Sequence, residues 1–175
     1  MLFTATGWPE RISALLLNQI RAVTIRETGE VLPSKAPDQL MMRGRLAGDA
    51  VVSVHVEAGK RSGRGVTIDI TGDEGDLRIT NRSAFGGVGD DYVIEGARGQ
   101  DVPLQPMAVP VAYDRLPPSD LPSAVLELAE LYVAAARDLR EGRHEAPTFA
   151  DAVRLHELLD AAAESTRQGR EVALR

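Results

Sequence analysis

Strands are predicted most clearly between Arg45 and Thr80, where β-branched residues alternate with polar ones. Valine occupies every second position from 52 to 56, and Val or Ile occupies every second position from 66 to 70. A period of two is typical of strands that bury one face. We therefore expect a meander of antiparallel strands with an apolar and a polar face. The polar positions in these two runs are Ser53, His55, Glu57, Thr67, Asp69 and Thr71.

Further strands are predicted on both sides of this stretch. Residues 39–46 form the first strand of the meander, and Gly48-Asp49 makes the hairpin turn that follows it. Residues 92–96 predict another strand, and a short one is expected near Leu104. Residues 102–118 contain five prolines, which exclude a helix and favour an extended segment. Residues 11–25 are ambiguous between helix and strand, because their three consecutive leucines suit either.

The last third of the chain has a helical period instead. An apolar stripe with spacings of four and three predicts one helix, which Ser119 or Asp120 would cap, with Pro122 in its first turn. A second helix is predicted from Thr148, a capping residue with Asp151 in the capping-box position, to Gly169. The stripe of the first helix consists of Leu121, Val125, Leu128, Tyr132, Ala135 and Leu139.

Strands that come first and helices that come last predict an α+β fold. We expect a mostly antiparallel, open-faced β-sheet with helices packed on one face and a C-terminal helix pair. At 175 residues the chain is predicted to form a single domain over residues 1–175. The opening residues resemble the last turn of a helix that ends near Gly7, so we expect that this first helix is truncated.

Composition and charge exclude several kinds of partner and of chemical site. The formal net charge is −6 and only 4% of the residues are aromatic, so an aliphatic core is expected and neither nucleic acid nor an anionic membrane is an expected partner. The chain has no cysteine, which excludes disulfides, thiolate nucleophiles and cysteine-ligated zinc. No apolar run approaches the roughly 20 residues of a membrane helix. These features together predict a cytoplasmic protein.

Few residues suggest chemistry. His55 and Glu57 would share one strand face, which suits an acid–base pair or two metal ligands, but no third ligand is evident, so no metal site is predicted. The basic loop at 59–65, with Lys60 and Arg61, suits either an anionic ligand or a solvated hairpin loop, and it is no Walker motif. Residues 86–89 do not make a dinucleotide fingerprint. No catalytic or cofactor-binding residue is predicted. The candidates for a substrate pocket or an interface are Ser53, His55, Glu57, Lys60, Arg61 and Asp69.

Several segments in order along the chain resemble the C-terminal domain of the Gfo/Idh/MocA family of NAD(P)-dependent oxidoreductases, in particular its Gal80-like branch. Each segment is weak by itself, and the set covers nearly the whole chain. The segments are Gly7-Trp8-Pro9-Glu10 with Ser13, Thr28-Gly29-Glu30, Lys35-Ala36-Pro37-Asp38-Gln39, Gly44 with Leu46 and Gly48, Ser53 with His55, Thr71 to Leu77, Pro147 to His156, Leu158 to Ala161, and Gly169-Arg170.

The resemblance implies a large, mostly antiparallel sheet whose open face contributes to the substrate pocket and to subunit contacts. Family members also have an N-terminal Rossmann domain that binds NAD(P), a Glu-Lys-Pro motif with the catalytic lysine, and a His-x-x-x-Asp motif. None of these is present here, where Lys35 and Lys60 are the only lysines. No catalytic residue carries over, no cofactor is expected on this chain alone, and whether the protein is an enzyme stays open.

Three functional hypotheses follow. The favoured one is a stand-alone or truncated substrate-binding and oligomerisation domain of a sugar or polyol oxidoreductase, inactive by itself and homo-oligomeric through the open sheet face. The alternative is a Gal80-like regulatory or small-sugar-binding protein without catalysis. The third is half of an enzyme that is completed by a separate Rossmann-domain chain.

Overall fold

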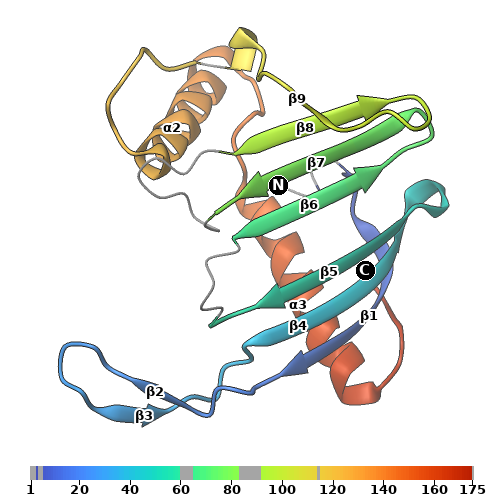
Figure 1. Cartoon of the computed structure of the whole chain (residues 1–175). Coiled ribbons are helices and arrows are strands. Elements are labelled where there is room, and N and C mark those ends of the chain that lie inside the picture. The colour runs from blue at the N-terminus through green and yellow to red at the C-terminus, as the bar shows by residue number, and fades with distance from the viewer. Residues whose placement is uncertain (1–2, 4–5, 60–64, 83–91, 114, 175) are drawn as a thin grey trace. The chain divides into compact units, whose positions relative to one another are not determined.

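The computed structural model describes residues 3, 6–59, 65–82, 92–113 and 115–174, which fall into two compact units (Figure 1). Unit one comprises Met1–Lys60 and Thr148–Arg175, and unit two comprises Arg61–Pro147. Each unit contains a four-stranded antiparallel sheet and one long helix. The predicted α+β class with a C-terminal helix pair is therefore confirmed. The single domain over residues 1–175 stays a prediction.

The sheet of unit one has the strand order β10-β1-β4-β5. Its strands are β1 (Pro9–Leu17), β4 (Gln39–Leu46), β5 (Val51–Glu57) and β10 (Val172–Ala173). A 3₁₀ turn, η1 (Ala47–Asp49), joins β4 to β5, with Gly48 at φ 74° and Asp49 at φ 64°. Glycine and aspartate tolerate this left-handed backbone better than other residues. The hairpin turn predicted at these two residues is confirmed. A separate hairpin consists of β2 (Ala22–Thr24) and β3 (Val31–Pro33).

The ambiguous leucines belong to a strand. Residues from Pro9 to Leu17 pair with β4 along its length, which places Leu16 on the core side and Leu15 and Leu17 on the other side. Three consecutive leucines are compatible with the hydrophobic period of a helix and with that of a strand. The strand forms because these residues pair with β4, which lies more than 20 residues further along the chain.

Helix α3 (Phe149–Gln168) covers one face of this sheet, as Figure 1 shows. The core consists of Ile12 and Met42 from the sheet and Leu158 and Ala162 from the helix, all at most 6% exposed. The helix starts with the predicted capping box: Asp151 N donates to Thr148 Oγ1, and Thr148 N donates to Asp151 Oδ2 at 2.8 Å. It ends at Gly169, also as predicted, in the left-handed conformation.

The last turn of α3 completes the hydrogen bonding of β1. Strand β10 pairs only with Arg11 and Ile12, so the edge of β1 beyond them has no strand partner. Ala14 N donates to Ser165 Oγ and Leu16 N donates to Thr166 Oγ1, both at 2.9 Å. Two side-chain hydroxyls thus take the place of a neighbouring strand, which leaves no open edge there for pairing with another chain.

Unit two contains the sheet β6-β7-β8-β9. Its strands are β6 (Val66–Thr71), β7 (Gly75–Asn81), β8 (Val93–Arg98) and β9 (Gln105–Pro106). Strands β6 and β7 pair as antiparallel neighbours, as expected for the predicted meander. The predicted continuous meander is wrong at one step, because β5 and β6 lie in different sheets of the described structure. An alternating pattern shows which face of a strand is buried but does not specify its neighbour.

After a 3₁₀ turn, η2 (Val111–Tyr113), unit two ends with helix α2 (Ser123–Glu141). The predicted cap of α2 is wrong. Pro122 occupies the N-cap position without a side-chain hydrogen bond, and Ser119 Oγ accepts from Leu121 N in the turn before it. Without an N–H or a polar side chain, proline fixes the entry of the helix by its rigid φ instead. Helix α2 ends at Gly142, which adopts the left-handed conformation.

The apolar stripe predicted on α2 is largely exposed. Leu128 is 50%, Tyr132 67% and Leu139 89% exposed, whereas Ala134, on another side of the helix, is buried. The spacing of the apolar residues correctly predicted helix α2, but it did not predict which side of the helix is buried.

Replacing Ser165 with alanine tests the hydroxyl contact with β1. The Ala14 N–H would lose its acceptor in a site where Ser165 is only 2% exposed. We expect the free energy of unfolding to fall by about 1–3 kcal/mol, measured by urea denaturation. Ser53→Ala, on the exposed face, is the control and should change it by less than about 0.5 kcal/mol. Equal losses of stability in the two variants would contradict the role of the Ser165 hydroxyl as the acceptor for the Ala14 N–H.

Replacing Asp151 with asparagine tests the capping box through its pH dependence. Hydrogen bonds from the backbone and the hydroxyl of Thr148 lower the pKa of Asp151. Its ionised form therefore stabilises the fold above the unfolded pKa of about 3.9, and this contribution is lost as the pH falls through the lower folded pKa. We expect the stability difference between wild type and Asp151→Asn to shrink between pH 5 and pH 2, in urea denaturation. A stability difference that stays constant with pH would argue against the capping box.

Candidate functional site

The side of the unit-one sheet opposite α3 is the candidate site, called here the open face. Alternation along β1, β4 and β5 points every second side chain to this side, in register across the three strands. Opposite residues on neighbouring strands have Cβ atoms about 4.5–5.5 Å apart. Four cross-strand rows result: Arg11-Arg45-Val51, Ser13-Arg43-Ser53, Leu15-Met41-His55 and Leu17-Gln39-Glu57.

The centre of the open face is apolar. Leu15 and Leu17 are each 44% exposed and Met41 is 55% exposed, although all three side chains are large and hydrophobic. Arg43 lies in the row on one side, and Glu57 in the row on the other. An apolar centre with charged groups around it is the usual anatomy of a surface that binds another protein.

Three of the predicted candidates, Ser53, His55 and Glu57, lie together on this face. His55 Nε2 is 3.4 Å from Gln39 Oε1 on the neighbouring strand. Their part in a substrate pocket or interface stays a prediction. The candidates Lys60 and Arg61 lie outside the described residues.

Asp69, the remaining candidate, lies on the polar face of the other sheet, in unit two. Arg78 on β7 pairs with it in register and donates from Nε to its Oδ1 at 2.6 Å. This hydrogen bond lowers the pKa of Asp69 and raises the pKa of Arg78. Asp69 is therefore ionised at neutral pH and paired across the strands, which makes it unsuitable as a general acid.

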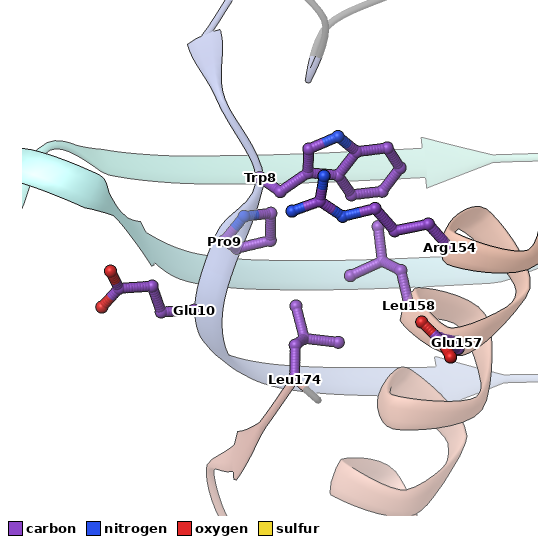
Figure 2. Close-up of a pocket in the computed structure, with 7 residues that line it drawn as sticks. All are labelled: Trp8, Pro9, Glu10, Arg154, Glu157, Leu158 and Leu174. Carbon is purple, nitrogen blue, oxygen red and sulfur yellow. The ribbon is translucent and has the colours of Figure 1, made fainter. Parts of the chain in front are cut away.

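The sequence alone failed to reveal a pocket in unit one, on the side of α3 (Figure 2). Its volume is about 220 Å³. The guanidinium carbon of Arg154 lies 4.6 Å from the centre of the Trp8 ring, and Phe3 stacks on the same tryptophan at 5.4 Å between ring centres. The pocket is lined by Trp8, Pro9, Glu10, Arg154, Glu157, Leu158 and Leu174. In the sequence, this pocket was indicated by the spacing of Arg154 and Leu158, which lie one helical turn apart on α3.

The described part of the chain brings together no group of three or more His, Cys, Asp or Glu side chains that could hold a metal ion. In the same residues, no helix is both long enough and apolar enough to cross a membrane.

Comparison with known proteins agrees with this fold. The family model of the C-terminal domain of Gal80p matches residues 1–81. No curated protein sequence matches the chain significantly. Among solved structures, a super-repressor mutant of Gal80p from Saccharomyces cerevisiae is 20% identical, with a TM-score of 0.76, over 98% of this chain and 46% of its own.

Two further structures have the same fold. Gal80p from Kluyveromyces lactis is 24% identical, with a TM-score of 0.73, over 99% of this chain and 42% of its own. Levoglucosan dehydrogenase, solved with NADH and L-sorbose, is 20% identical, with a TM-score of 0.75, over 97% of this chain and 46% of its own. The chain thus spans less than half the length of each of these proteins.

Both lines of comparison lead to Gal80p, one through the sequence of residues 1–81 and the other through the fold of almost the whole chain. These findings agree with the resemblance seen in the sequence: residues 1–81 match the family model of the C-terminal domain of Gal80p, and almost the whole chain has the fold that Gal80p and levoglucosan dehydrogenase share.

Proposed function

We propose that the chain is a substrate-binding and oligomerisation domain of an NAD(P)-dependent sugar or polyol oxidoreductase, without dehydrogenase activity of its own. The observation that supports this proposal is the open face, with Leu15, Leu17 and Met41 exposed at its centre. A stable protein interface buries about 800 Å² on each partner. A sheet face of three long strands is a suitable surface for such a contact.

The charges of the open face favour a second copy as the partner. In a two-fold pair the same patch occurs on both sides of the contact. A two-fold axis along the row Leu15-Met41-His55 brings the row of Arg43 in one copy opposite the row of Glu57 in the other. The apolar centres then meet each other, and residues of opposite charge surround them, which favours this register.

The nucleotide, in this proposal, is bound by a separate nucleotide-binding chain or domain. Levoglucosan dehydrogenase was solved with NADH, and the present chain spans 46% of it. The chain itself has no dinucleotide fingerprint and no Glu-Lys-Pro motif. We infer that hydride transfer requires the partner and that this domain contributes substrate contacts and assembly.

A second candidate is a regulatory or small-sugar-binding protein that performs no catalysis. The match of residues 1–81 to the Gal80p model favours it, because Gal80p from Kluyveromyces lactis is described as a transcriptional regulator. A sugar would then bind to this chain in the absence of any nucleotide.

Adjacent residues on opposite faces of β5 test the proposed assembly. His55 lies on the open face, and Val56, which is 54% exposed, points to the other side. We expect His55→Asp and Met41→Asp to shift the chain toward monomer by at least about tenfold in dissociation constant, measured by sedimentation equilibrium. The control Val56→Asp should leave association unchanged, with circular dichroism to verify folding. A wild-type monomer, or equal effects of all three variants, would refute the open face as the interface.

Ligand titrations separate the two candidate functions. For the proposed domain we expect no saturable change in NADH or NADPH fluorescence when the purified chain is added. A ligand that binds only the folded state raises the melting temperature, and the rise grows with the logarithm of one plus the ratio of ligand concentration to Kd. A thermal shift with L-sorbose or a sugar acid, without nucleotide, would favour the sugar-binding protein instead. Saturable nucleotide binding would overturn the proposal that a separate domain holds the cofactor.

A further inference from the structure

The Arg154 guanidinium is fixed in place but has unused hydrogen-bonding capacity. Its central carbon lies 4.6 Å from the centre of the Trp8 ring, and Phe3 stacks on the same tryptophan. Stacking uses the flat face of a guanidinium, whereas its five N–H donors lie in its plane. Within the described part of the chain these donors make no hydrogen bond, although the positive charge of Arg154 helps to lower the pKa of Asp151, and the group lines the pocket beside Trp8.

The remaining walls of the pocket divide into apolar and acidic parts. Pro9, Leu158 and Leu174 form an apolar floor, on which the side chains of Leu158 and Leu174 point toward each other below Arg154 in Figure 2. Glu157 comes from the same helix as Arg154, and Glu10 lies at the start of β1. In Figure 2 the Glu10 side chain points away from Arg154, so the pocket offers one cation, the carboxylate of Glu157 and an apolar surface within about 220 Å³.

We propose that this pocket binds a small aliphatic α-amino acid. The ligand carboxylate accepts paired hydrogen bonds from Arg154, its ammonium group donates to Glu157, and its side chain covers Pro9, Leu158 and Leu174. Paired contacts between a guanidinium and a carboxylate are among the strongest hydrogen bonds in proteins. The volume fits a ligand of this size, since drug-sized molecules occupy pockets of roughly 300–1,000 Å³.

Other small ligands match fewer of these groups. A phosphate or a dicarboxylate would meet Arg154 but also a like charge, the carboxylate of Glu157. A simple amine would pair with Glu157 and face the positive charge of Arg154. A sugar has no apolar side chain to cover the floor. Of these ligands, only a zwitterion with an aliphatic side chain matches the cation of Arg154, the carboxylate of Glu157 and the apolar floor together.

The chain provides its own reporter for this pocket, because Trp8 is its single tryptophan. We expect L-leucine to cause a saturable change in tryptophan fluorescence, because it binds the guanidinium that lies on the indole. Two matched probes each lack one charged group: 4-methylpentanoate has no ammonium, and 3-methylbutylamine has no carboxylate. Each should bind at least about tenfold more weakly than L-leucine, given that a hydrogen bond to a charged group contributes about 1.5–3 kcal/mol.

Substitutions on one helix localise the binding. Arg154→Gln should weaken L-leucine binding by at least about tenfold. Isothermal titration calorimetry gives a readout that does not depend on how the substitution alters Trp8 itself. The control Arg167→Gln, on the same helix, removes an exposed arginine that pairs with Glu164 and should bind L-leucine as wild type does.

Three results would overturn the proposal. The first is no binding of L-leucine to the wild-type chain by either method. The second is equal binding of L-leucine and one of the singly charged probes, which would indicate an anion or an amine site. The third is unchanged binding to a folded Arg154→Gln variant. None of these results bears on the open face, so the two proposals fail independently.

Discussion

The contact between α3 and β1 is the constraint on which the rest of unit one depends. Ile12 of the strand packs against Leu158 and Ala162 of the helix, which makes it the centre of the small core. One helical turn further on, Ser165 and Thr166 supply acceptors for the strand's unpaired amides. Apolar packing and hydrogen bonding therefore act on the same strand from the same helix. The strand, held in this way, gives β4 and β5 a fixed template on its other edge.

This contact also determines what the two sides of the sheet can do. The side covered by α3 contains the core and, at its margin, the Trp8–Arg154 pocket. The other side remains open, with Met41 and two leucines exposed along its middle rows. One sheet therefore separates a surface suited to association from a pocket suited to a small ligand. Alternation along each strand lets both exist in the same short sequence, because neighbouring residues belong to different sides.

Local patterns predicted much of this architecture. The alternation at positions 52–56 identified β5 and the face that it buries, residues 39–46 were predicted as the strand β4, and Gly48-Asp49 marked the turn between them. Thr148 and Asp151 marked the start of α3 for a similarly local reason, since a capping box involves residues only three apart. For α2 the same reasoning failed in part: its period was correct, but Pro122 replaced the expected polar cap and the predicted stripe was not the side that packs.

The sequence by itself thus determined β4, β5, β6, β8 and the two long helices, and placed Ser53, His55 and Glu57 on one strand face. Only the tertiary structure decided that Leu15-Leu16-Leu17 is a strand, that β5 and β6 belong to different sheets, and that Arg154 lies on Trp8. The physical reason is the range of the interactions. Periodicity and capping act over a few residues, whereas the stacking of Arg154 on Trp8 joins residues at opposite ends of the chain, and no local pattern specifies such a contact.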